Sequence, residues 1–424
     1  MPIPANPGMG MRLLKGLPPM AKQTPSDLLI GLATCDITPP VGATLVGYKP
    51  RASTSLAHAL RAEALFVKDA ASGAAWVLVT SDMIGYPREY VNQVRAKVAQ
   101  KTDLAPEALL ISGTHTHSGP AVTYFGTGTP SDLDTQYLTT LQGRLVDLVA
   151  AAMAAAQPGT FEVAWTEAPT LGSNRRIEGP DGKWINEWID ADGKHPGYFD
   201  PAVLLVAVRR PGGSLDRLLV NYGCHPVVLG PQSLAISADY VGYMKDALEA
   251  SGKVASAAFA LAGGGNINPR FCIQEGAEHP KAMGQKLAAI VLTALDKLRP
   301  VAPGRVVAHQ QEWNVVRTRD SMKRKDRPHS QAGDTIPTEI QAFRAGDLGL
   351  VSLPGELFSE YAKWLREAAP TRDTLVVSLA NDYIGYLPTD QAQAEGAYET
   401  NMAPAEALEK SLLAAAAKAF KAIT

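Results

Sequence analysis

The chain has 424 residues, of which 40 are Lys or Arg and 42 are Asp or Glu, giving a net charge of −2. This balance excludes a surface that as a whole attracts nucleic acid or an anionic membrane. The three cysteines, Cys35, Cys224 and Cys272, are widely spaced, so they form neither a disulfide framework nor a CxxC metal site. A reducing, cytoplasmic compartment is therefore expected.

The first 27 residues contain six prolines and lack the apolar run of a signal peptide, so we expect a disordered leader at 1–27. No later segment has about 18 uncharged apolar residues in a row, and no membrane span is predicted. Strand-like and helix-like runs then alternate. Ser131, with Asp134 three residues on, can cap a helix with a leucine-rich stripe that ends before Pro158. The other elements expected up to that point are strands at 63–69, 74–82 and 108–114 and a helix at 86–100.

The second half of the chain continues the alternation. Strands are predicted at 161–165, 202–210, 217–223, 256–263 and 374–379, three strands within 305–353, and helices at about 239–251, 278–298, 356–368 and 404–422. No internal repeat is visible, and residues 170–200 form the main irregular insertion. The alternation predicts an α/β layered fold in one domain, roughly 28–424.

Polar residues that can bind metals follow several of these strands. The stretch "ISGTHTHSGPA" places His115 and His117 two residues apart at a strand end, where both side chains point to the same side. His225 and Glu356 each follow an apolar strand in the same way, as do Tyr383 and Tyr386. Ligands gather outside the carboxyl ends of strands in α/β sheets, so these residues form a plausible cluster. Taken singly, each also has a structural reading: a hydrogen-bonded loop histidine, a helix-opening glutamate, or packed tyrosines.

The order of six motifs resembles the neutral/alkaline (non-lysosomal) ceramidases over roughly residues 28–400. These motifs are "CDITPPVGATLVGY", "SGTHTHSGPA", "NYGCHPVVL…SADYVGY", "GGGNINPR", "VSLPGELFSEY" and "NDYIGYLPTDQAQAEGAYE". The resemblance implies a layered α/β/α catalytic domain with mixed sheets. The full-length ceramidases carry a further β-rich domain, and we expect none in this chain.

The resemblance also implies the roles of individual residues. It assigns one Zn²⁺ per chain to His115, His225, Glu356 and Tyr386, with Tyr383 as the rival tyrosine. Imidazole, carboxylate and phenol oxygen are ligands that suit zinc. The catalytic residues that it implies are His117 as the proton carrier, Arg175 as a substrate contact, and Tyr398 as a second active-site tyrosine.

One motif departs from the family pattern. In "GGGNINPR", Asn268 stands where the ceramidases carry a serine, and a carboxamide can hydrogen-bond but cannot act as a nucleophile. This favours attack by zinc-activated water without an acyl-enzyme.

The combined reading is a zinc-dependent hydrolase of an amide C–N bond. We expect a small polar N-acyl substrate rather than long-chain ceramide, because of Asn268, the missing β-rich domain and the absence of an export signal. The alternatives are a zinc esterase or lactonase, a true ceramidase, and a non-catalytic metal- or ligand-binding relative. No nucleic-acid partner is expected, and a homo-oligomer is left open.

Overall fold

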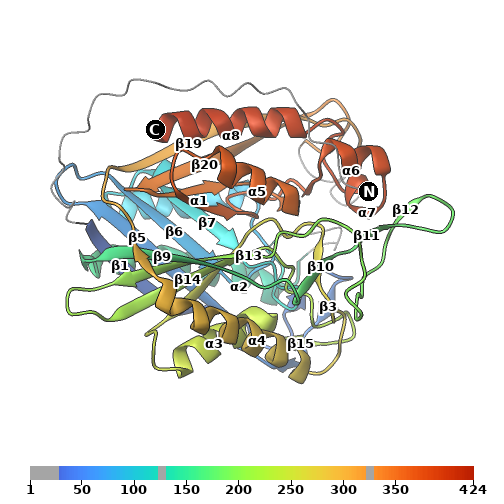
Figure 1. Cartoon of the computed structure of the whole chain (residues 1–424), viewed down its shortest axis with the longest axis horizontal. Helices are drawn as coiled ribbons and strands as arrows, with labels where there is room; N and C mark the ends of the chain where they lie inside the picture. Colours follow the sequence, from blue (N-terminus) through green and yellow to red (C-terminus); the bar gives the residue numbers. More distant parts are fainter. Residues whose placement is uncertain (1–27, 123–129, 321–328) are drawn as a thin grey trace.

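The computed structural model of the chain describes residues 28–122, 130–320 and 329–424, so the predicted leader at 1–27 lies outside the described residues. Two five-stranded sheets and one four-stranded sheet form the framework of this part of the chain. Helices α3 (Asp239–Ala250) and α4 (Glu278–Ala294) lie along one side of the molecule in Figure 1, and α5 (Ser359–Ala368) and α8 (Glu409–Ile423) along the opposite side. The predicted α/β layered class with mixed sheets is confirmed.

The first sheet has the strand order β7-β6-β5-β1-β8. The strands predicted at 63–69 and 74–82 are β5 and β6, which pair as an antiparallel hairpin. Strand β6 pairs in parallel with β7, and helix α1 makes the crossover between them. The predicted cap of α2 is also present, because the Ser131 and Asp134 side chains bond each other's backbone N–H groups. The elements of this unit are β1 (Leu28–Asp36), β5 (Arg61–Asp69), β6 (Ala75–Ser81), α1 (Arg88–Lys101), η1 (Pro106–Ala108), β7 (Leu109–Gly113), α2 (Asp132–Ala154) and β8 (Gln157–Pro158).

The second and third sheets have the orders β16-β14-β13-β9-β18 and β19-β20-β21-β23. Each ends in one parallel pair, β14 with β16 and β21 with β23, joined through α3 and α5. The second unit comprises β9 (Thr160–Glu167), β13 (Ala202–Arg209), β14 (Leu215–Tyr222), α3, β16 (Ala257–Leu261), α4, η2 (Leu295–Lys297) and β18 (Arg299–Pro300). The third unit comprises β19 (Val306–Val316), β20 (Thr335–Ala345), β21 (Leu348–Ser352), α5, β23 (Asp373–Val377) and α8.

The same topology therefore occurs three times. Each unit has two antiparallel pairings, then a parallel crossover through a helix, then a second helix that packs on the early strands of its own sheet or on the crossover helix. The sequence showed no internal repeat, because topology depends on the pattern of buried positions and the three units share that pattern without sharing residues. Outside the carboxyl ends of the three parallel pairs, loops from all three units come together.

Those loops contain short strand pairs that connect distant segments. The pairs are β2 (Thr44–Leu45) with β3 (Arg51–Ala52), β4 (Ser55–Leu56) with β15 (Ala235–Ile236), β10 (Gly172–Asn174) with β17 (Ile267–Pro269), β11 (Arg176–Glu178) with β12 (Trp184–Asn186), and β22 (Glu356–Leu357) with β24 (Tyr386–Leu387). Two short helices, α6 (Asp390–Glu395) and α7 (Tyr398–Asn401), follow. The helix expected at 356–368 starts only at Ser359, because its first residues form β22. The last helix begins at Glu409 rather than at 404.

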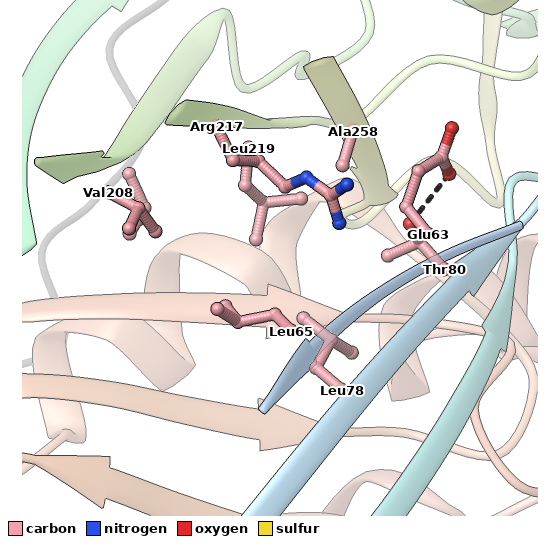
Figure 2. Close-up of a pocket in the computed structure, with 9 residues that line it drawn as sticks. Glu63, Leu65, Leu78, Thr80, Val208, Arg217, Leu219 and Ala258 are labelled. Atoms are coloured by element: carbon pink, nitrogen blue, oxygen red, sulfur yellow. Dashed lines mark hydrogen bonds between the residues drawn. The ribbon is translucent and has the colours of Figure 1, made fainter. Parts of the chain in front are cut away.

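The interior contains charged groups as well as apolar side chains. Figure 2 shows Arg217 and Glu63 between the first and second sheets, beside an internal cavity of about 10 Å³. Glu63 accepts a hydrogen bond from Thr80 at 3.2 Å, and the Arg217 guanidinium donates to the Ala33 and Ala64 carbonyls. A cavity of this size has room for about one water molecule, so it is not a ligand site.

Candidate metal centre

The three sheets each contribute a potential metal ligand to one place. His115 and His117 follow β7 of the first sheet, His225 follows β14 of the second, and Glu356 follows β21 of the third. All are buried except His117, which is half-buried. His115 has a φ of 77°, a left-handed conformation that non-glycine residues adopt at a cost and that often marks functional sites. The structure thus brings together the histidines and the glutamate that the sequence predicted.

The spacing of the ligand atoms fits a single ion. The Glu356 Oε2 atom lies 3.4 Å from His115 Nε2 and 3.0 Å from His225 Nε2. The Nε2 atoms of His115 and His117 are 3.4 Å apart. Tetrahedral zinc with bonds of about 2.0–2.1 Å separates its ligand atoms by about 3.3 Å. The ligand atoms of the three histidines all lie within 4.8 Å of one another, so this donor set fits a metal ion of zinc's size.

The hydrogen bonding of the second ring nitrogen, Nδ1, distinguishes His115 and His225 from His117. His115 Nδ1 lies 2.6 Å from the Ile84 carbonyl, and His225 Nδ1 lies 2.5 Å from the Gly264 carbonyl. Metal-ligating histidines are oriented in this way, with Nδ1–H on an acceptor and Nε2 left for the metal. His117 Nδ1 is buried and has no hydrogen-bond partner among the described residues. Only His115 and His225 therefore show the full pattern of ligand histidines.

The protonation states also suit a metal. Burial lowers the pKa of His225 to about 4, and burial together with His115 and His225 lowers the pKa of His117 well below its usual value. Burial alone would raise the pKa of Glu356, but the two neighbouring histidines, His115 and His225, hold it well below its usual range. At neutral pH the site therefore offers neutral His117 and His225 rings and an ionised carboxylate.

Both candidate tyrosines reach this centre, with different partners. Tyr386 is the direct partner of Glu356 in the parallel pairing of β22 with β24, and its hydroxyl accepts a hydrogen bond from Arg175 at 3.1 Å. The Tyr383 hydroxyl donates to Glu356 Oε1. Burial raises the pKa of Tyr386 well above its ordinary value, so its phenol stays protonated in the metal-free protein.

Arg175 holds one wall of the site together. Its guanidinium donates to Glu399 at 2.7 Å, to the Asn268 side-chain oxygen at 2.9 Å and to the Gly265 carbonyl at 2.8 Å, besides Tyr386. Glu399 is fully buried, and the sequence reasoning missed it although it directly follows the predicted Tyr398. The Arg175 guanidinium, which was predicted to contact substrate, thus already donates hydrogen bonds to protein groups.

Tyr398 and Asn268 lie around the same arginine. The Tyr398 ring centroid is 5.7 Å from that of Tyr386, and Tyr398 remains partly exposed. The Asn268 amide nitrogen donates to the Trp188 carbonyl at 3.3 Å, so both ends of this carboxamide are hydrogen-bonded to protein. Asn268 therefore supports Arg175 rather than standing free in the cavity.

A cavity of about 700 Å³ opens onto the centre, within the range of ligand pockets. Its charged lining includes Lys49, Arg317 and Asp320 in addition to the residues of the centre. The rest of the lining is largely aromatic and aliphatic, with Tyr48, Ile84, Trp188, Ile273, Tyr383, Ile384, Tyr386, Tyr398 and Met402.

Comparison with known proteins supports the family and the fold. The model of the N-terminal part of the neutral/alkaline non-lysosomal ceramidase family matches residues 28–286. The crystal structure of neutral ceramidase from Pseudomonas aeruginosa superposes with a TM-score of 0.76 at 18% identity, covering 93% of this chain and 75% of that one. A ceramidase complexed with C2 gives a TM-score of 0.74 at 17% identity, covering 89% of this chain and 72% of the other. A search of curated proteins finds no match. Among the described residues, no helix has the length and apolar character needed to cross a membrane.

Proposed function

Because this chain belongs to the neutral/alkaline non-lysosomal ceramidase family, we propose that it is a zinc-dependent hydrolase that cleaves an amide C–N bond with water. The observation that carries the proposal is the convergence of His115, His225 and Glu356 from three sheets, with Glu356 Oε2 3.4 Å and 3.0 Å from the two Nε2 atoms. A zinc ion held there would lower the pKa of water toward 7 and polarise a carbonyl. Tyr386 is the proposed fourth ligand, and Tyr383 is assigned to orient the Glu356 carboxylate by donating to it.

The roles proposed for His117, Tyr386 and Asn268 follow from their protonation and their hydrogen bonds. His117 is uncharged at neutral pH, so its imidazole can take a proton and pass it to the leaving nitrogen. The Tyr386 oxygen accepts from Arg175, so its own proton points elsewhere and can serve a developing oxyanion if the oxygen does not coordinate. Asn268 is hydrogen-bonded at both ends and cannot replace a nucleophilic serine, which supports direct attack by water.

The pocket bears on the kind of substrate. Its volume of about 700 Å³ and its aromatic and aliphatic lining favour an N-acyl substrate with a sizeable apolar part. The expectation of a small polar substrate stays a prediction that this lining does not favour. The cytoplasmic location stays a prediction as well.

The test is a substrate panel on the zinc-loaded protein. N-acyl amines from acetyl to palmitoyl, including ceramide, are compared with the esters of the same acyl groups, and the released amine is quantified. We expect amide turnover that disappears in Glu356→Gln. Turnover of the esters alone would assign the site to an esterase, and no turnover of either class in zinc-loaded protein would contradict the proposal.

A further inference from the structure

The loop between β2 and β3 packs directly against His117. The Gly47 backbone lies so close to the imidazole that a Cβ there would stand 2.3 Å from His117 Cγ. The Tyr48 ring meets the His117 ring edge-on, with centroids 4.9 Å apart. The Arg51 guanidinium donates to the His117 carbonyl at 2.8 Å and lies over the Tyr48 ring at 5.2 Å. The imidazole is thus enclosed from several sides by one short segment.

This enclosure matters because His117 has no ring hydrogen bond of the kind that orients His115 and His225. Its Nδ1 is buried without a partner among the described residues, and its Nε2 faces His115 Nε2 at 3.4 Å. A histidine without such a hydrogen bond must be held in one orientation by other contacts if it is to act on substrate. Packing against a rigid loop meets this requirement.

The loop itself is firmly attached on both sides of the centre. Gly47 has a φ of 98°, which glycine adopts without strain. The Tyr48 hydroxyl donates to the Leu229 carbonyl at 3.0 Å, and Arg51 Nε donates to the Ser233 carbonyl at 2.9 Å. The Val46 N–H donates to the Gly119 carbonyl at 3.2 Å. The loop is therefore tied both to the segment that carries His117 and to the segment that follows His225.

We propose that Gly47, Tyr48 and Arg51 are positioning residues that fix the His117 imidazole by shape and backbone contact. The inference rests on the proposed function, because it takes His117 as the proton carrier. In this scheme Gly47 is required for the space it leaves, Tyr48 for its ring edge, and Arg51 for the one bond to the His117 backbone.

The decisive variant is Gly47→Ala, with Gly73→Ala as its matched control. Both glycines have a positive φ, 98° and 76°, but a Cβ on Gly73 would meet no atom within 4 Å. The pair therefore separates the effect of backbone strain from that of a displaced imidazole. A misplacement of about 1 Å can lower turnover about 100-fold. We expect Gly47→Ala to lower kcat by about that factor with KM and zinc content unchanged, and Gly73→Ala to match the parent in all three.

A second readout does not depend on activity. With ¹⁵N-histidine labelling of the zinc-loaded protein, the His117 ring signals are identified by their loss in His117→Gln. We expect Gly47→Ala to shift them while the His115 and His225 signals stay in place. Arg51→Gln should give a smaller shift, which Arg51→Lys partly restores because a single donor remains.

The outcomes are distinct. A Gly47→Ala protein with parent-like kcat and unchanged His117 signals would overturn the inference, and so would loss of zinc together with activity. If the parent protein hydrolyses no amide, the proposed function fails, and the His117 signals still decide whether this loop positions the ring.

Discussion

Replacing Lys245 by methionine should be among the most destabilising single changes outside the metal centre. The Lys245 side chain is fully buried, and its ammonium lies 2.9 Å from Glu63 Oε1 and 2.8 Å from Asp82 Oδ2. Both carboxylates are also buried, and Arg61 Nε lies 3.6 Å from Glu63 Oε1. Removing one partner of a buried ion pair costs about 3–5 kcal/mol, because the remaining charge is left uncompensated.

The cost is measured by urea unfolding of the metal-free protein, followed by tryptophan fluorescence. The matched control is Lys101→Met, because Lys101 pairs with Asp147 at 2.6 Å but both side chains are largely exposed. That change should cost less than about 1 kcal/mol. A loss below about 1 kcal/mol in Lys245→Met as well would refute the argument that this buried network is paired and charged.

The same network supports the metal centre. Asp82 accepts from the Thr114 hydroxyl at 3.4 Å, and the turn that begins at Asp82 supplies the Ile84 carbonyl for His115 Nδ1. Loss of an orienting partner of a ligand typically weakens metal binding about 10–100-fold. We therefore expect Lys245→Met to bind zinc at least about tenfold more weakly, as measured by competition with a chelator.

Three further changes probe the centre. Tyr386→Phe should lower kcat by about 100-fold or more, and by more than Tyr383→Phe, because the Tyr386 oxygen is the proposed ligand or oxyanion donor. Equal turnover in Tyr386→Phe and the parent would show that the oxygen is not used. Burial lowers the pKa of His225 from 6.5 to about 4, so its contribution to stability is complete above pH 6.5 and is lost as the pH falls through 4. In urea unfolding of the metal-free protein, the free energy of unfolding should fall by about 3 kcal/mol across that window, and this fall should be absent in His225→Gln. A difference between parent and variant that does not change with pH would contradict this expectation. Glu399→Gln removes the carboxylate that pairs with Arg175, so it should lower both the urea midpoint and kcat. An unchanged kcat would show that this ion pair does not contribute to catalysis.

The sequence predicted what depends on local pattern. The capped helix after Ser131 and the buried strand before His115 follow from residue spacing, and the structure contains both. Strand β1 contains Gly31 within its apolar run. That glycine is there because α2 passes so close that a Cβ would stand 1.8 Å from the Ala152 carbonyl oxygen.

Contacts between distant segments could not be predicted from the sequence. Glu399 and Arg175 are 224 positions apart, and nothing in either local stretch indicates that they pair. The contact of Gly47 with His117 depends equally on the tertiary fold. The threefold repeat of the topology was not predicted for another reason. The three units share the order of their strands but not their residues.

The most direct test of the central claim is the zinc content of the purified protein and its alanine variants, measured by elemental analysis after loading and removal of free metal. The account predicts about one zinc per chain in the parent and in His117→Ala, and strongly reduced zinc in His115→Ala, His225→Ala and Glu356→Ala. Full zinc retention in His115→Ala, or no stoichiometric zinc in the parent, would contradict it.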